Sequence, residues 1–118
     1  MMQNLPEYKV SIEEIHHTQK LDAPSGTAIT LAEGVITNSK YTQWKLDDDS
    51  NGSLPITAKR IGETPGTHTV TYDNVVDSIE IKHTAHNREG FALGAVTAAE
   101  WIIGKTGIFS MRDVLNLA

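Results

Sequence analysis

The sequence contains no cysteine among its 118 residues. This absence excludes disulfide bridges, thiolate metal sites, iron–sulfur clusters and thiol nucleophiles. It is also typical of a protein kept in the reducing cytoplasm, which is the localisation that we expect. At this length the chain has room for one compact domain with one core, whereas a two-domain enzyme of ordinary size would not fit.

Long apolar runs and positive charge are also scarce. No stretch approaches the roughly 20 apolar residues needed to span a bilayer, and the N-terminus carries neither the basic region nor the apolar stretch of a secretory leader. The chain has ten basic and fifteen acidic residues, which gives a formal net charge of −5. Since phosphate backbones attract the opposite balance of charge, we expect neither nucleic acid nor a membrane as a partner.

The hydrophobic patterns that are present alternate between strand and helix. Alternating residues over 9–17 predict a strand whose two faces each end in a histidine. Apolar residues at helical spacing after an Asp/Pro/Ser cluster predict a helix over 25–37. Residues 41–54 are polar and acidic, and are interpreted as an exposed loop without chemistry. About four strands and several helices together indicate an α+β fold class. The other predicted elements are strands at 56–61, 68–73 and 77–85, a helix at 90–104 and a short helix after 110.

Cationic residues gather just ahead of the first predicted helix. His16, His17 and Lys20 lie within five residues, and the N–H groups at the start of the helix would be free. Such N–H groups and the helix dipole bind anions. We therefore expect Gly26 and Thr27 to hold a carboxylate, because a glycine lets a ligand approach the backbone. The two histidines and Lys20 would then supply proton transfer and charge stabilisation.

Each of these residues, taken alone, also has an ordinary structural role, since strand-end histidines, loop lysines and helix caps are common. Their combination in one segment favours a binding site. A metal site built from the five histidines and nearby carboxylates is an alternative. Adjacent histidines of a strand point to opposite faces, which makes His16 and His17 a poor chelating pair. His83 and His86 are an equally weak pair.

The chain reads Glu-x-His-His-x-x-Lys-x-Asp-x-Pro-Ser-Gly-Thr-Ala from Glu14 to Ala28. This segment resembles, without a break, the substrate-site motif of the dihydrodipicolinate reductases. Segments similar to later parts of that family follow in the same order, so the resemblance runs from about residue 10 to the C-terminus. These later segments are Arg60-x-Gly62-x-x-x-Gly66-x-His68, His83-x-Ala85-x-x-Arg88-x-x-Phe91-Ala92-x-Gly94-Ala95 and Gly107-x-Phe109-x-Met111-Arg112-Asp113-Val114-Leu115.

The resemblance implies a role for each residue of the cationic segment. His16 would be the acid/base residue, and Lys20 would donate a proton to the ring that is reduced. His17 would contact the substrate. Gly26 with Thr27 would bind a substrate carboxylate, which is the role that the residues themselves suggest.

The resemblance also implies an activity and an architecture. The family's enzymes are NAD(P)H-dependent reductases of the diaminopimelate route to lysine, and they reduce a cyclic dihydrodipicolinate-type dicarboxylate to tetrahydrodipicolinate. Their substrate domain is an open mixed sheet with helices packed on one face, and it assembles a homotetramer. A separate N-terminal domain binds the dinucleotide through a Gly-x-Gly-x-x-Gly turn. The nine glycines of this chain never take that spacing.

We therefore expect residues 1–118 to be a single substrate-binding and oligomerisation domain of a longer reductase whose dinucleotide-binding domain is absent here. The full-length enzyme would bind NADH or NADPH, and this chain alone would bind no cofactor and show no turnover. The alternative is a non-catalytic binding or oligomerisation module that retains the fold. Structural roles are expected for Asp22, which orients the turn, and for Arg60, His68, Arg88 and Phe91, the last as a core residue.

Overall fold

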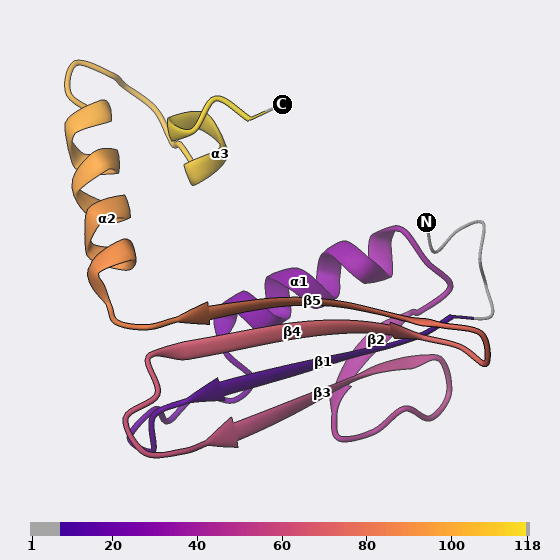
Figure 1. Ribbon diagram of the computed structural model, residues 1–118. Helices are drawn as coiled ribbons and strands as arrows, with labels where there is room; N and C mark the ends of the chain where they lie inside the picture. The colour runs from indigo at the N-terminus through magenta and orange to yellow at the C-terminus, as the bar shows by residue number, and fades with distance from the viewer. Residues whose placement is uncertain (1–7, 118) are drawn as a thin grey trace. The chain divides into compact units, whose positions relative to one another are not determined.

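The computed structural model describes residues 8–117, which form two compact units (Figure 1). The first unit extends to His86 and the second begins at Asn87. The N-terminal residues, for which the sequence predicts no leader, lie outside the described range. None of the helices in the described range is both long enough and apolar enough to cross a membrane.

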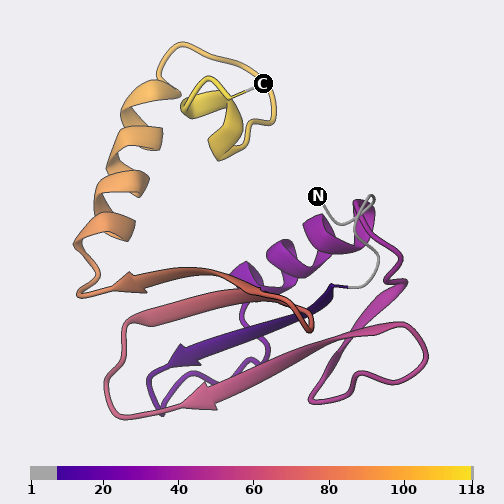
Figure 2. The ribbon, with the colours of Figure 1, turned by 45° about the vertical axis from the view of Figure 1, so that its right-hand side comes forward.

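An open five-stranded mixed sheet forms the first unit (Figures 1 and 2). Its strands stand in the order β2-β3-β1-β4-β5. The central strand β1 runs parallel to β3 and antiparallel to β4, and β5 is an edge strand antiparallel to β4. The predicted α+β class with an open mixed sheet is confirmed, with one strand more than expected. The strands are β1 (Lys9–His16), β2 (Gln43–Leu46), β3 (Ser53–Arg60), β4 (Gly66–Asp73) and β5 (Ser78–Ala85).

The additional strand, β2, corrects the interpretation of residues 41–54 as a loop. Trp44 pairs with Leu54 in a parallel ladder, and its side chain packs against the core. After β2, residues 47–52 return the chain to β3 through left-handed conformations at Asp47 and Asn51. The sequence did not predict β2 because residues 41–54 are mostly polar. The strand is held by backbone pairing and by one aromatic residue, Trp44.

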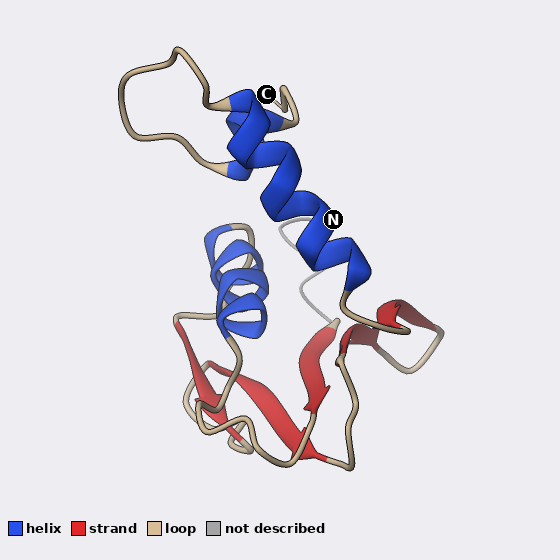
Figure 3. Cartoon of the chain, turned by 90° about the vertical axis from the view of Figure 1, so that its left-hand side faces the viewer, coloured by secondary structure: helices blue, strands red, loops and turns tan. Residues whose placement is uncertain are grey.

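The core lies between the sheet and helix α1 (Gly26–Thr37), which covers one face of the sheet (Figure 3). The buried side of the helix is formed by Ala28, Ala32 and Val35, at the spacing of one helical face. Their small side chains let the helix approach the sheet closely. Burial of a large aliphatic side chain contributes about 1.5 to 3 kcal/mol. The buried apolar residues of the sheet side are Tyr8, Val10, Ile12, Leu54, Ile56 and Val70.

The second unit consists of helices α2 (Glu89–Trp101) and α3 (Met111–Val114). Both helices were predicted, and the Ser110 N–H donates to Asp113 at 2.7 Å in a capping box at the start of α3. Trp101 packs edge-to-face on Phe109 with ring centroids 5.1 Å apart.

No residue of α2 or α3 is buried. The expectation that Phe91 is a core residue is therefore wrong, because its side chain is 52% exposed. Arg88 is exposed at the N-terminal end of α2, as expected of a surface charge. The other large apolar residues exposed on α2 and in the loop after it include Leu93, Val96, Ile103 and Ile108.

Candidate functional site

Glu14, near the end of β1, contributes a carboxylate to a polar network with His16, Ser25 and Arg60. The alternation of β1 places Glu14 on the same face as Val10 and Ile12, and its side chain is fully buried. Arg60, at the end of β3, forms an ion pair with it. The Ser25 N–H donates a second hydrogen bond to the carboxylate at 2.6 Å. A charged group on a buried face requires such partners.

These partners keep Glu14 ionised. Burial alone would raise the pKa of Glu14, but the hydrogen bonds from the Arg60 guanidinium and the Ser25 N–H, together with the nearby His16 ring, outweigh burial and hold the pKa below its usual value. At neutral pH a negative charge therefore lies within the polar network, compensated by the charge of Arg60.

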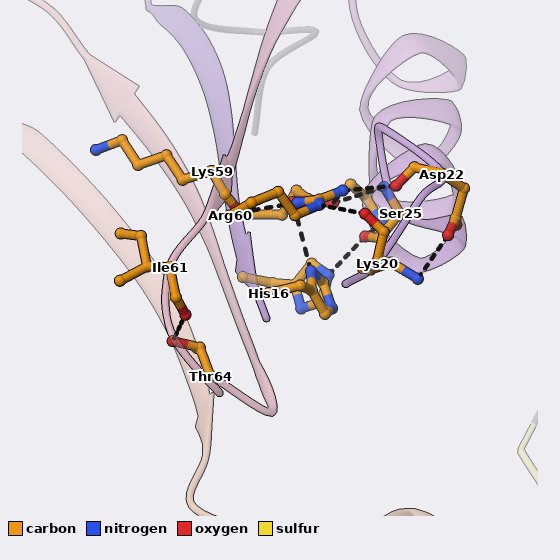
Figure 4. A network of polar contacts seen from close by, with 11 residues as sticks. His16, Lys20, Asp22, Ser25, Lys59, Arg60, Ile61 and Thr64 are labelled. Atoms are coloured by element: carbon orange, nitrogen blue, oxygen red, sulfur yellow. Dashed lines mark hydrogen bonds and ion pairs between the residues drawn. The ribbon is translucent and has the colours of Figure 1, made fainter. Parts of the chain in front are cut away.

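Arg60 also fixes the loop that carries Lys20. Its Nε donates to the Lys20 carbonyl at 3.3 Å, and its Nη2 donates to the Asp22 carbonyl at 2.6 Å. The ammonium group of Lys20 lies 3.1 Å from the Asp22 carboxylate, and the hydrogen bond from Lys20 lowers the pKa of Asp22. Asp22 thus takes part in ordering this turn, which agrees with the orienting role expected for it. Figure 4 shows Arg60 reaching from the sheet toward Asp22 and Ser25, beside His16.

His16 lies between the carboxylate of Glu14 and the ring of His68. Its Nδ1 atom is 3.4 Å from Glu14 Oε1, and its ring centroid is 5.1 Å from that of His68 in an edge-on arrangement. The Nε2 atom of His68 lies 2.9 Å from Ser25 Oγ. The pKa of His68 is lowered, first by burial and then by the charge of His16.

The start of α1 offers free backbone donors. Gly26 and Thr27 are exposed, and within residues 8–117 no hydrogen bond occupies either of their N–H groups. The next residue, Ala28, donates to the capping hydroxyl of Ser25 at 3.2 Å. A Cβ atom at Gly26 would meet nothing within 4 Å. No packing of the described residues requires a glycine here, and the free N–H groups can bind an anion.

His17, the remaining predicted site residue, faces a different environment from His16. It lines a surface pocket of about 370 Å³ together with Thr18, Gln19, Gly62 and Glu63. His17 lies directly after the last residue of β1, where the chain leaves the strand and turns at Thr18 and Gln19. Among the described residues, no three metal-ligating side chains are placed to share an ion.

Three further residues take part in the network, although they were not predicted as site residues. Packing roles were expected for Arg60 and His68, and no role was expected for Glu14, which lies in the motif. A signal for Glu14 was available, because the alternation of β1 puts this acidic residue on the same face as Val10 and Ile12.

Comparison with known proteins agrees with the resemblance. The family profile described as "Dihydrodipicolinate reductase, C-terminus" matches residues 1–115. The 4-hydroxy-tetrahydrodipicolinate reductase of Christiangramia forsetii is 61% identical over 117 residues, which are 98% of this chain and 49% of that protein. The reductase of the same name from Methanosarcina mazei is 43% identical, over 96% of this chain and 45% of its own length.

A solved structure shares the fold. It is described as the dipicolinate-bound dihydrodipicolinate reductase of Paenisporosarcina sp. TG-14, and it matches with a TM-score of 0.64 at 24% identity. The match covers 80% of this chain and 39% of that one. The chain spans about half the length of the curated relatives it matches. It belongs to the family of the C-terminal parts of dihydrodipicolinate reductases.

Proposed function

We propose that this chain is the substrate-binding part of a reductase that converts a cyclic dihydrodipicolinate-type dicarboxylate to tetrahydrodipicolinate in lysine and diaminopimelate biosynthesis. The observation that carries the proposal is the convergence of His16, the Lys20 loop and the start of α1 on the Glu14–Arg60 pair. The names of the relatives support the same activity.

Each proposed role follows from the chemistry of a dicarboxylate. The N–H groups of Gly26 and Thr27, and the Thr27 hydroxyl, bind one carboxylate at the positive end of the α1 dipole. His17 contacts the substrate. Reduction of a conjugated ring leaves negative charge on it, which Lys20 neutralises as the proton donor, and His16 serves as the acid/base residue.

The described residues do not fit a dinucleotide. Dinucleotide-binding folds have a mostly parallel sheet, whereas β4 of this sheet is antiparallel to both of its neighbours. The glycines also lack the Gly-x-Gly-x-x-Gly spacing. NADH or NADPH would therefore be held by an N-terminal dinucleotide-binding domain outside these 118 residues, and the chain alone would be inactive. The share of the relatives that the chain covers supports this division. Oxidation of NAD(P)H by the chain above that of a His16→Ala variant would contradict it.

The chain would also form a homo-oligomer, a tetramer in the whole enzyme. Edge strand β5 presents Ile81 with 63% of its side chain exposed, and α2 exposes Leu93 and Val96. Exposed apolar surface on an edge strand and a helix favours coverage by another chain or domain. The mass of the chain in solution, measured by light scattering, tests this proposal.

The competing function is a non-catalytic binding or oligomerisation module with the same fold. An oligomerisation module requires no dicarboxylate site, so ligand binding separates it from the proposed function. We expect calorimetric titration with pyridine-2,6-dicarboxylate, a planar analogue of the substrate, to detect binding to the chain. Lys20→Ala should remove that binding. Lys45→Ala is the matched control, because Lys45 is a half-exposed lysine of β2 that only approaches Asp48, at 3.9 Å.

Loss of binding in Lys20→Ala but not in Lys45→Ala would support the substrate site. A folded chain that takes up no dicarboxylate would contradict a preformed site on this chain. The same titration on a full-length reductase would then decide whether closure of the cofactor domain completes the site or the motif binds no substrate at all.

A further inference from the structure

Glu14 contacts three separate parts of the candidate site, although neither proton transfer nor ligand binding is assigned to it. Its carboxylate faces the His16 ring on its own strand, the Ser25 N–H at the start of α1 and the Arg60 guanidinium on β3. One fully buried group thus joins the end of a strand to the start of a helix.

The contact with His16 bears on where that imidazole holds its proton. Among the described residues, the buried Nδ1 atom of His16 has no hydrogen-bond partner, and Glu14 Oε1 lies 3.4 Å from it. A neutral imidazole carries one proton on one of its two nitrogens. A lone pair on Nδ1 would face a carboxylate, which is repulsive, whereas an N–H there is attracted to it. Catalytic hydrogen bonds are often long before a ligand binds.

The opposite ring nitrogen of His16 is directed to the start of β4. A Cβ atom at Gly66 would lie 3.2 Å from His16 Nε2, so the glycine leaves room for the ring. With the proton on Nδ1, Nε2 keeps its lone pair and can accept a proton, as the acid/base role requires.

The other contacts of the pair fix the remaining elements of the site. Glu14 holds the Ser25 N–H at 2.6 Å and thereby sets the N-cap that precedes the free N–H groups. Arg60 binds the carbonyls of Lys20 and Asp22. Lys20 is therefore anchored through its backbone to the same buried ion pair that orients His16.

We propose that Glu14 is a positioning residue, with Arg60 as its counter-charge, which holds His16 as the Nδ1–H tautomer and ties the end of β1 to the start of α1. This inference rests on the proposed function for its purpose, but its central claim concerns a proton on one nitrogen and is measured without any ligand.

The test is long-range ¹H–¹⁵N correlation spectroscopy of the histidine rings in the 118-residue chain at a pH where His16 is neutral. Comparison with a His16→Gln spectrum assigns the signals. We expect the protonated nitrogen of His16 to be Nδ1. A predominant Nε2–H tautomer in the unmodified chain would overturn the proposal, and this result does not depend on any Glu14 variant folding.

Glu14→Gln supplies the second measurement. The amide oxygen stays with the Ser25 N–H, so the amide NH₂ takes the place of Oε1, which faces both the Arg60 guanidinium and His16 Nδ1. Toward His16 this group can only donate, so the proton moves to Nε2. We expect the ratio of Nδ1–H to Nε2–H to fall by about tenfold or more, the equivalent of one hydrogen bond. An unchanged ratio in folded Glu14→Gln would overturn the proposal.

The matched control is Glu13→Gln, the preceding residue of the same strand. Glu13 forms a half-exposed ion pair with Lys59 at 2.9 Å, so the same two strands lose an ion pair on the other face. We expect no change of tautomer in this variant, and an equal change in both variants would overturn a specific role for Glu14. The dicarboxylate titration is carried out on the same samples. Absence of binding contradicts the proposed function, whereas the tautomer of His16 tests the positioning role of Glu14 separately.

Discussion

The Nε2 atom of His68 lies 2.9 Å from the Oγ atom of Ser25 and joins β4 to the start of α1. The same Oγ accepts the Ala28 N–H at 3.2 Å, which leaves the hydroxyl hydrogen for His68. His68 accepts this hydrogen when Nε2 is unprotonated and the ring proton is on Nδ1, and it donates to Oγ when Nε2 carries a proton. The N-cap of α1 is therefore coupled to the protonation state of a histidine on a neighbouring strand.

Protonation of His68 should destabilise the fold. Burial, followed by the charge of His16, lowers the pKa of His68 below the value near 6.5 of an unfolded histidine. Between these two pKa values the unfolded chain binds more protons, so the free energy of unfolding falls as the pH drops below about 6.5. We expect the urea midpoint to decrease from about pH 7.5 to about pH 5, and to decrease less in His68→Gln.

The control for this titration is His86→Gln, because His86 is exposed beyond the end of β5. That variant should keep the full pH dependence of the unmodified chain. If His68→Gln loses stability on acidification as steeply as the unmodified chain does, the dependence belongs to other groups.

Removal of the Ser25 hydroxyl should cost stability as well. Ser25→Ala deletes both the cap of α1 and the partner of His68, and loss of a cap typically lowers the free energy of unfolding by about 1 kcal/mol. Thr37→Ala in the same helix removes an exposed hydroxyl that bonds the Glu33 carbonyl, and should change stability by less than about 0.5 kcal/mol. Urea unfolding followed by circular dichroism compares the two, and equal effects would argue against a special role of the cap.

The sequence predicted the local elements of this fold well, because their signals are local. The alternation of β1 and the spacing of Ala28, Ala32 and Val35 each reflect one buried face, and both were recognised from the residues alone. β2 was missed because four residues beside an acidic turn carry almost no periodic signal. What makes Gln43–Leu46 a strand is its pairing with β3, which is a tertiary contact.

The candidate site divides in the same way. His16, Lys20 and Gly26 lie in one continuous segment, so the short stretch of chain between them keeps them close together. Arg60 and His68 reach Glu14 and Ser25 from positions 46 and 43 residues away. These contacts depend on strand register, Glu14 opposite Ala58 on one side and opposite His68 on the other. No pattern within a single strand specifies its register against two neighbours.

The close approach of Gly66 to His16 predicts a change at the site from a substitution outside the motif. In Gly66→Ala the new Cβ would press on His16 Nε2 from 3.2 Å, and the positive φ of 159° adds strain. We expect shifted His16 ring resonances and weaker dicarboxylate binding.

Gly62→Ala is the control: its φ of 49° is also strained, but its Cβ meets nothing within 4 Å. It should lower stability by about 1 kcal/mol and leave the His16 ring resonances unchanged. Similar His16 shifts in both variants would point to general strain rather than to this contact.

Gly26 offers the sharpest separation of ligand binding from folding. A Cβ at this position meets no atom within 4 Å, and the residue opens α1, so alanine should leave stability unchanged or raise it by up to about 1 kcal/mol. The same methyl group would stand over the free N–H groups and keep a carboxylate away from them.

Gly34→Ala is the control. It lies in the middle of the same helix, is equally free of neighbours, and should stabilise the chain without affecting ligand binding. We expect the affinity for pyridine-2,6-dicarboxylate, measured by calorimetry, to fall at least tenfold in Gly26→Ala, the loss of roughly one charge-assisted hydrogen bond, and to stay constant in Gly34→Ala. Undiminished binding by a stable Gly26→Ala chain would remove the start of α1 from the site and leave the carboxylate to the side chains of the histidines and Lys20.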